Sequence, residues 1–283
     1  MLRIVMDSAG DLPDGWAKKY EIETIPINIH FGDKTFLQGV DLSNSEFYDL
    51  VNKSGVIPKT SQPTPQQFID FYEEIAIPGD DILSIHVTSK LSGTFESAIL
   101  AAKELFGKFN IIPIDSCAGT ASQGYMCKEA RELDYTNTPL SKIIARMEYI
   151  ARNINVIFTL GTLEYVRMSG RVRALQAVFA SILNVKPIIV LREGILESGA
   201  KVRTKRRALE YIVDQMLSRV EEQLVNVAVV HAEDHKDGNY LLEIVKRKFN
   251  YNEVILTELS IGIAANLGPG TIGLVVYPVE ESI

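Results

Sequence analysis

The 283-residue chain has two cysteines, one tryptophan and four histidines, and it lacks any long apolar run. Cys117 and Cys127 are too few for a disulfide framework, and their spacing fits no common zinc motif, so we interpret both as reduced thiols. No stretch approaches the roughly 18 apolar residues of a membrane-spanning helix, and the first ten residues show no signal-peptide core. These absences predict a cytoplasmic protein without integral membrane association.

Motifs for nucleophilic, phosphate and metal chemistry are missing from the sequence as well. A serine nucleophile needs a histidine base, and none of the histidines accompanies a G-x-S-x-G elbow. No glycine-rich stretch carries G-K-[ST], and no His/Cys/Asp cluster suggests a metal site. We therefore expect no catalytic residue, no metal and no cofactor, and we interpret the histidines as structural: His30, His86, His231 and His235.

Charge argues against a general affinity for nucleic acid, because the net charge is −7. One basic run stands out: KVRTKRR, residues 201–207, has five basic residues in seven. It is open to three interpretations, namely a solvated helix start, a nucleic-acid contact and a protein-docking patch. Without a base-reading motif, the docking patch is the preferred interpretation.

The first half of the chain alternates short apolar runs with amphipathic helices, which predicts an α/β domain with a largely parallel sheet. Helices are expected to begin after Ser43 and Thr64, because each starts a capping-box pattern, with Glu46 and Gln67 respectively. The expected strands cover residues 2–6, 24–29, 82–87, 109–114 and 155–160.

The second half has a different pattern, which predicts an α+β domain with a mixed sheet. An apolar helix is expected over 174–183, followed by two short strands around Glu193-Gly194 and a pair of late strands around NLGPGT. A long charged helix is expected over about 203–224. The further elements are a strand over 225–232, a helix over 239–249 and a strand over 253–259. The length fits two domains, which we place at 1–160 and 161–283.

Five polar segments lie just after a strand or just before a helix. Three of them follow parallel strands and should meet at the carboxyl edge of the sheet, where open α/β sheets bind ligands. In SKLSGTFESA (89–98), Ser92-Gly93-Thr94 comes where a helix begins, and free N–H groups there attract an anion. The neutral hydroxyls suit holding a carboxylate without reacting with it. The segments are DSAGDLP (7–13), KTSQPTP (59–65), KLSGT (90–94), DSCAGTASQG (115–124) and NLGPGT (266–271).

These segments, with LEYVRMSGRV, LNVKPIIVLREGIL and KVRTKRRA, resemble in order and spacing the DegV family of bacterial fatty-acid-binding proteins, from about residue 3 to 279. The resemblance implies two α/β domains with a long-chain fatty acid buried between them. It also implies a partner, a separate fatty acid kinase that phosphorylates the acyl carboxylate with ATP.

The resemblance implies site residues by motif. Carboxylate contacts would come from Thr60 and Ser61, from Ser92 with the Gly93 and Thr94 amides, and from Ser116; Arg171 and Asn266 would lie near the head group, and Arg203 would face the partner. Relatives commonly have His-x-Gly-Pro-Gly, whereas this chain has Asn266 in place of the histidine. Asparagine donates a hydrogen bond but cannot shuttle a proton. We therefore expect this chain to bind a fatty acid, whereas the substitution argues against a part for position 266 in phosphate transfer.

Two alternatives to a fatty-acid-presenting protein stay open at this point. The first domain is similar to one in dihydroxyacetone kinases, which hold substrate covalently through a histidine, but no histidine here lies in a matching motif. A lipid-responsive regulatory protein would share the same binding site.

Overall fold

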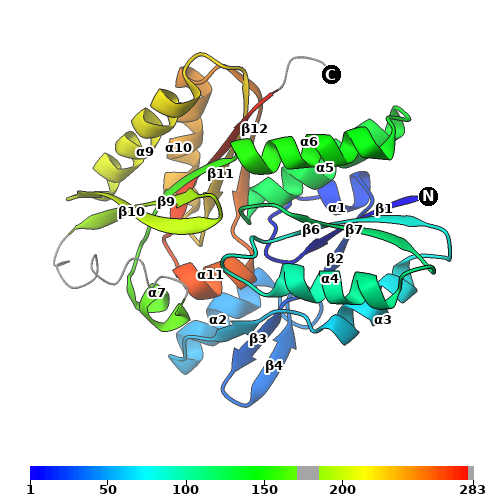
Figure 1. Ribbon diagram of the computed structural model, residues 1–283. Coiled ribbons are helices and arrows are strands. Elements are labelled where there is room, and N and C mark those ends of the chain that lie inside the picture. Colours follow the sequence, from blue (N-terminus) through cyan, green and yellow to red (C-terminus); the bar gives the residue numbers. More distant parts are fainter. Residues whose placement is uncertain (171–184, 280–283) are drawn as a thin grey trace. The chain divides into compact units, whose positions relative to one another are not determined.

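The structure is a computed structural model that describes residues 1–170 and 185–279 (Figure 1). Two of the predicted features, the helix at 174–183 and Arg171, lie outside the described residues. The chain forms two compact units. Unit 1 consists of Met1–Arg152 with Ser260–Ile263, and unit 2 of Asn153–Leu259 with the chain that follows Ile263.

Unit 1 contains the parallel sheet that the alternation of strands and helices predicts. The strand order is β2-β1-β6-β7, and every pairing in it is parallel. Strands of such sheets are buried on both faces, which explains why they are rich in isoleucine and leucine. The strands are β1 (Leu2–Asp7), β2 (Ile22–Ile25), β6 (Asp81–His86) and β7 (Asn110–Asp115).

Both predicted capping boxes are present in the helices of unit 1. The side-chain oxygens of Ser43 and Thr64 accept hydrogen bonds from the backbone amides of Glu46 and Gln67. In return, the side-chain oxygens of Glu46 and Gln67 accept hydrogen bonds of 2.9 Å from the backbone amides of the two cap residues. The helices are α1 (Trp16–Lys19), α2 (Asn44–Ser54), α3 (Pro65–Ile75), α4 (Thr94–Glu104), α5 (Ala121–Tyr135) and α6 (Leu140–Asn153).

One predicted strand, at 24–29, is wrong in detail, because the chain changes sheets at Pro26. β2 ends at Ile25, and β3 (Asn28–Phe31) begins a separate antiparallel sheet of order β4-β3-β5, with β4 (Lys34–Leu37) and β5 (Lys59–Ser61). Proline has no N–H to donate, so it interrupts a continuous ladder. The last two residues of β5, Thr60 and Ser61, begin the stretch Thr60-Ser61-Gln62, which we call the TSQ segment.

Unit 2 is built on a mixed sheet of order β10-β9-β8-β13-β11-β12, in which only β11 and β12 pair in parallel. The predicted strands around Glu193-Gly194 are present as the antiparallel pair β9 and β10. The strands are β8 (Asn155–Thr159), β9 (Lys186–Arg192), β10 (Ile195–Val202), β11 (Val225–His231), β12 (Tyr251–Glu258) and β13 (Ile272–Pro278).

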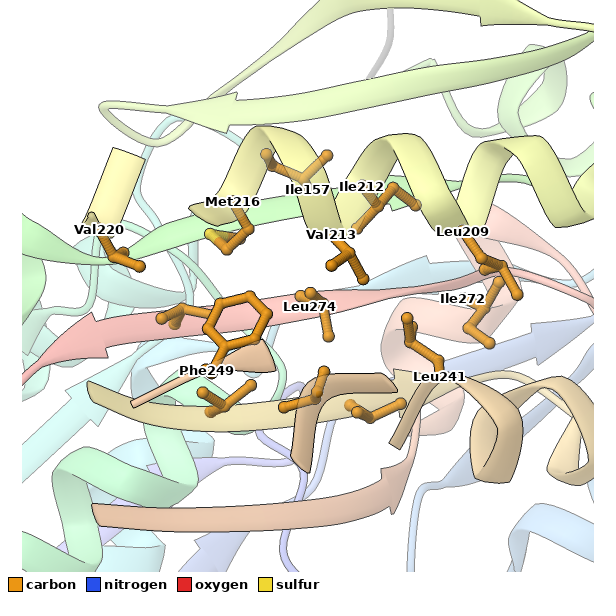
Figure 2. Packing of buried hydrophobic residues seen from close by; sticks show 14 of the residues in the cluster. Ile157, Leu209, Ile212, Val213, Met216, Val220, Leu241, Phe249, Ile272 and Leu274 are labelled. Carbon is orange, nitrogen blue, oxygen red and sulfur yellow. The ribbon is translucent and has the colours of Figure 1, made fainter. Parts of the chain in front are cut away.

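The core of unit 2 lies between one face of this sheet and two helices, α9 (Lys205–Val220) and α10 (His235–Lys248). Figure 2 shows Ile212, Val213 and Met216 of α9 directed toward Leu274 of β13. Alternate residues of β11 and every third or fourth residue of α9 are buried here, as their periods require. A shorter helix, α7 (Glu164–Ser169), follows β8.

Of the two strands expected around NLGPGT, the one before the turn is wrong. Residues Ile261–Leu267 form helix α11, and only the strand after the turn, β13, is present. Ile261, Ala264 and Ala265 are buried at the helical spacing of three and four residues. Gly268 ends the helix in the left-handed conformation (φ 83°), which glycine adopts without strain.

Within the two described stretches of chain, we find no helix that combines the length and the apolar character needed to cross a membrane.

Candidate functional site

The loops after β1, β6 and β7 are hydrogen-bonded to one another at the carboxyl edge of the parallel sheet. The amide of Thr88 donates to the carbonyl of Ala118 (2.8 Å), and the amide of Thr120 donates to that of Ala9 (2.9 Å). The prediction that three of the polar segments meet at this edge is thereby confirmed. Backbone bonds between loops hold the edge in one conformation, as a binding site requires.

A chain of hydrogen-bonded, buried polar side chains lies next to this edge of the sheet. The carboxylate of Asp7, at the end of β1, accepts the Val87 amide (2.8 Å) and lies 3.1 Å from Nδ1 of His86. His86 Nε2 lies 2.7 Å from the Ser84 hydroxyl, which lies 2.8 Å from the hydroxyl of Tyr72. All these side chains are fully buried, which is compatible with the structural role that the sequence analysis predicts for His86.

The predicted Ser92-Gly93-Thr94 turn lies at the start of α4. The hydroxyls of Ser92 and Thr94 are 2.8 Å apart, and the Thr94 amide donates to Ser92 Oγ (3.3 Å). Gly93 is the N-cap residue and has no side chain to accept the amides of the first helical turn. Two hydroxyls and the positive end of an eleven-residue helix therefore lie together, which favours a negatively charged group.

The TSQ segment lies against this turn, although the two are about thirty residues apart in the sequence. A Cβ on Gly93 would come within 2.7 Å of Nε2 of Gln62, so the Gln62 side chain lies directly over the helix start. Asn28 of β3 supports the segment by donating to the Gln62 carbonyl (3.2 Å). Gln62 thus adds an amide group that donates and accepts hydrogen bonds.

Thr60 and Ser61 are half-buried on β5, where Thr60 is paired with Ile29 of β3. The hydroxyl of Ser61 lies 2.8 Å from Nε2 of His30, and Nδ1 of the same ring lies 2.9 Å from Thr35 Oγ1. His30 thus orients the Ser61 hydroxyl. This position of His30 beside a predicted site residue does not follow from the sequence, from which only a structural role is expected.

The DSCAGT loop holds Ser116 differently from the other hydroxyls. Ser116 is fully buried, and its Oγ accepts the amide of Ala118 (3.3 Å) inside the loop, so its contact with a ligand stays a prediction. Cys117 (φ 53°) and Thr120 (φ 58°) both have positive φ angles, which non-glycine residues seldom adopt. Backbone strain of this kind concentrates at ligand-binding loops.

Buried oxygen atoms near these loops have unused hydrogen-bonding capacity. Among the described residues, no partner lies within hydrogen-bond distance of Thr120 Oγ1, Gln123 Oε1 or Ser260 Oγ. Leaving such a group unpaired costs about 1–3 kcal/mol, so the loops favour an added polar group or ordered water.

Neither thiol chemistry nor metal chemistry fits the residues at this edge. Burial and the nearby Asp115 carboxylate raise the pKa of the half-buried Cys117 thiol, so it is protonated and weakly nucleophilic at neutral pH. In the parts of the chain that the structure covers, no three His, Cys, Asp or Glu side chains are grouped as metal ligands. The arrangement suits binding through neutral donors.

The two remaining predicted residues that the structure describes lie in unit 2. Asn266 is half-buried on α11, next to a turn in which Gly268 and Gly270 have positive φ angles. A Cβ on Gly161 would come within 2.3 Å of the Pro269 carbonyl, so this turn packs tightly on the end of β8. The head-group role of Asn266 stays a prediction.

The basic run contributes less free charge than its sequence suggests. Lys205 forms ion pairs with Asp234 and Asp237, the latter at 2.9 Å, and Arg206 pairs with Glu210. Arg203 is exposed just before α9 begins, and its role as a partner contact stays a prediction. Because Lys205 and Arg206 are paired with carboxylates, the basic run 201–207 has little free positive charge, which argues against nucleic-acid binding by these residues.

Unit 1 therefore places the TSQ segment against the SGT turn through Gln62, and it places His30 beside Ser61. Gln62 lies inside a motif that the sequence analysis quoted, so its position in KTSQPTP was the available signal. No sequence signal identifies His30, because its neighbour Ser61 is 31 positions away and is reached through the β3–β5 pairing.

Comparisons with known proteins agree along the whole chain. The family model described as "Uncharacterised protein, DegV family" matches residues 1–279. A DegV domain-containing protein of Listeria monocytogenes is 31% identical over 275 residues, which is 96% of this chain and 97% of the relative. Protein DegV of Bacillus subtilis is 28% identical over 276 residues, which is 96% of this chain and 98% of the relative.

Two solved structures have the same fold. The Thermus thermophilus structure, described as fatty acid binding of a DegV family protein, has a TM-score of 0.89 at 29% identity and covers 98% of this chain and 99% of its own. The Bacillus subtilis structure, described as DegV, a fatty acid binding protein, has a TM-score of 0.88 at 26% identity with coverages of 98% and 99%. Because the family model and these full-length matches agree, the chain belongs to the DegV family.

Proposed function

We propose that this protein binds a long-chain fatty acid with its carboxylate at the hydroxyl cluster of unit 1. The observation that carries the proposal is the pair of hydroxyls of Ser92 and Thr94, 2.8 Å apart at the start of α4, with the Gln62 amide over them. The solved relatives from Thermus thermophilus and Bacillus subtilis, both described as binding fatty acid, support it.

A carboxylate suits this arrangement better than a reacting group does. It only accepts hydrogen bonds, and hydroxyls, a side-chain amide and first-turn amides only need to donate to it. An ionised carboxylate removed from water is costly unless several donors satisfy it. The cluster supplies those donors without a base in contact with the Ser92 hydroxyl.

The acyl chain would supply most of the affinity. Each buried methylene contributes about 0.8 kcal/mol, so roughly fifteen methylenes offer on the order of 12 kcal/mol before the costs of association. The head-group contacts then mainly fix the position of the carboxylate.

We further propose that the bound fatty acid is presented to a separate fatty acid kinase. There, a carboxylate oxygen would attack the γ-phosphorus of ATP, with ADP leaving, to form an acyl phosphate. The site described in unit 1 supports this division of labour, because its donors hold a carboxylate in place while the phosphoryl donor would come from the partner. The exposed Arg203 is the predicted contact with that partner.

Lipid extraction tests the binding proposal directly. The protein is expressed in bacteria, purified without detergent and extracted, and the extract is analysed by mass spectrometry. We expect long-chain fatty acid in near-stoichiometric amount, and heat stabilisation when fatty acid is added back to stripped protein. If the extract contains no fatty acid and none added back raises the unfolding temperature, the proposal is wrong.

A separate assay tests the kinase step. Protein loaded with labelled fatty acid is incubated with ATP and a bacterial fatty acid kinase, and acyl phosphate is trapped with hydroxylamine as the hydroxamate. Formation that depends on both proteins supports presentation, whereas a loaded protein that yields no hydroxamate limits the function to binding.

A further inference from the structure

Unit 2 contains a cavity of about 150 Å³ between α9 and the β8-β9-β10 part of the sheet. Its floor is formed by Ile157, Ile188 and Val190, at the margin of the hydrophobic core. The opposite wall on β10 includes Ser198 and Gly199, which are too small to fill the space. We call this space the Arg219 cavity.

Polar side chains of α9 form the other wall of the Arg219 cavity. Tyr211, Gln215 and Arg219 follow one another at intervals of four residues, so they lie on one face of the helix and point the same way. All three are half-buried. Within the described chain, neither the Tyr211 hydroxyl nor the Gln215 side-chain amide has a hydrogen-bond partner, so both are available to a ligand.

The charges around the cavity do not balance. Arg192 and Arg219 both line it, whereas Glu197 is the one carboxylate among the described lining residues. Glu197 lies 3.7 Å from the Arg192 guanidinium, and among the described residues Arg219 makes only a long hydrogen bond of 3.5 Å to the side-chain oxygen of Asn155. Burial and the charge of Arg192 lower the pKa of Arg219, whereas Glu197 and Tyr211 act in the opposite direction.

Guanidinium groups do not lose their charge at neutral pH, and Glu197 supplies one negative charge for the two of them, so a bound anion would balance the second. A carboxylate or phosphate matches the planar fork of arginine with two parallel hydrogen bonds. Water occupies about 30 Å³ per molecule, so the cavity has the size of roughly five waters or one small organic anion. The apolar floor accommodates a short alkyl group beside the charged end.

We propose that the Arg219 cavity is a second ligand site, which takes a small oxyanion, either a short-chain carboxylate or a phosphate. It is distinct from the head-group site, because every lining residue belongs to unit 2 and none belongs to the hydroxyl cluster of unit 1. Its size excludes the long acyl chain that the proposed function requires.

Titration of the full chain tests the proposal and separates the two chemistries. Butyrate, inorganic phosphate and butyramide are titrated separately at constant ionic strength, with calorimetry as the measurement. We expect saturable binding of butyrate or of phosphate, and none of butyramide, which has the same shape as butyrate but no charge. Binding of only one anion assigns the ligand class. If neither anion saturates, or if butyramide binds equally, the proposal is overturned.

Matched arginine variants locate the binding. Arg192→Gln and Arg219→Gln should each weaken the anion roughly tenfold or more, because each removes a charge-assisted hydrogen bond. Arg206→Gln is the control, since Arg206 is exposed on the same helix and pairs with Glu210 away from the cavity. The side chain of Arg192 is 62% exposed, so Arg192→Gln keeps the test valid if Arg219→Gln fails to fold.

Ser92→Ala separates this proposal from the fatty acid site. The variant should bind the small anion as the wild type does, whatever its effect on fatty acid. Equal weakening by Arg192→Gln and Arg206→Gln, or loss of small-anion binding in Ser92→Ala, would place the anion elsewhere and refute the proposal.

Discussion

The side-chain amide of Gln62 lies so close to Gly93 that a Cβ at position 93 would be 2.7 Å from its nitrogen. This contact joins the TSQ and SGT segments, which the chain otherwise places on separate elements, β5 and α4. Glycine at position 93 therefore keeps the space in which the amide of Gln62 sits over the helix start. Its φ angle of −81° is ordinary, so the requirement is for space and not for an unusual backbone.

Gly93→Ala is expected to lower fatty acid affinity while leaving the fold intact. The methyl group displaces the Gln62 amide, and alanine is a poorer N-cap than glycine, so stability should fall by about 1 kcal/mol or less. Calorimetric titration and thermal unfolding measure the two effects. The double variant Gly93→Ala with Gln62→Ala removes the clash and should bind no worse than Gln62→Ala alone. Unchanged affinity in the single variant would mean that Gln62 has no part in binding.

Ser92→Ala should weaken fatty acid binding by about 1–3 kcal/mol, the usual cost of losing one partner of a charge-assisted hydrogen bond. Ser141→Ala, at an exposed position on α6, is the matched control and should bind as the wild type does. Displacement of a fluorescent fatty acid is a sufficient measurement. Equal affinities of the two variants would remove Ser92 from the head-group site.

Asn266→His tests the head-group role proposed for Asn266. If Asn266 lies near the carboxylate, the wild type should bind fatty acid with little change between about pH 5.5 and 8, since an amide does not titrate. A histidine there becomes charged near pH 6.5 and should bind the anion more tightly on the acidic side. Calorimetry at three pH values compares the proteins, and identical profiles would show that position 266 does not contact the head group.

His231 should make unit 2 less stable as the pH falls below neutral. Burial and the nearby His235 lower its pKa, whereas Glu258 and Asp234 act in the opposite direction. Its Nδ1 accepts the Asp234 amide (3.3 Å), a bond that the protonated ring cannot make. Because the pKa is lower in the folded state, stability is complete above about pH 6.5, the unfolded value, and falls as the pH decreases through the folded-state pKa.

Thermal unfolding of wild type and His231→Asn between pH 7.5 and 5.5 measures this effect. The asparagine oxygen preserves an acceptor but does not titrate, so the variant should lose less stability over this range. His235→Gln removes one of the causes and should give an intermediate slope. Parallel curves for wild type and His231→Asn would assign the pH dependence to other groups.

The sequence predicted those parts of the fold that depend on local chemistry. Capping boxes at Ser43 and Thr64, and the β9–β10 turn at Glu193-Gly194, follow from residues within a few positions of one another. The strand over 24–29 failed because a short apolar run does not reveal that its two halves belong to different sheets. A strand before the turn was the wrong prediction for residues 261–267, which form a helix, because a following Gly-Pro-Gly turn is compatible with a helix as well as a strand.

The candidate site was predictable only in part, for a related reason. Ser92 and Thr94 are close in sequence, so their pairing follows from the turn itself. The approach of Gln62 to Gly93, and that of His30 to Ser61, depends on how β3 and β5 pair, which one sequence does not show.

The buried chain of Asp7, His86, Ser84 and Tyr72 has a consequence for how unit 1 unfolds. A carboxylate only accepts, so Nδ1 of His86 donates to Asp7, and the contacts of Nε2 with Ser84 and of Ser84 with Tyr72 continue the chain of hydrogen bonds. The four groups are satisfied only when β1, β6 and α3 are all in place. If any one of these elements opens, the buried donors of the others lose their hydrogen-bond partners, so the three elements act as a single cooperative unit. The amide of Val87 therefore exchanges its hydrogen only when that unit opens.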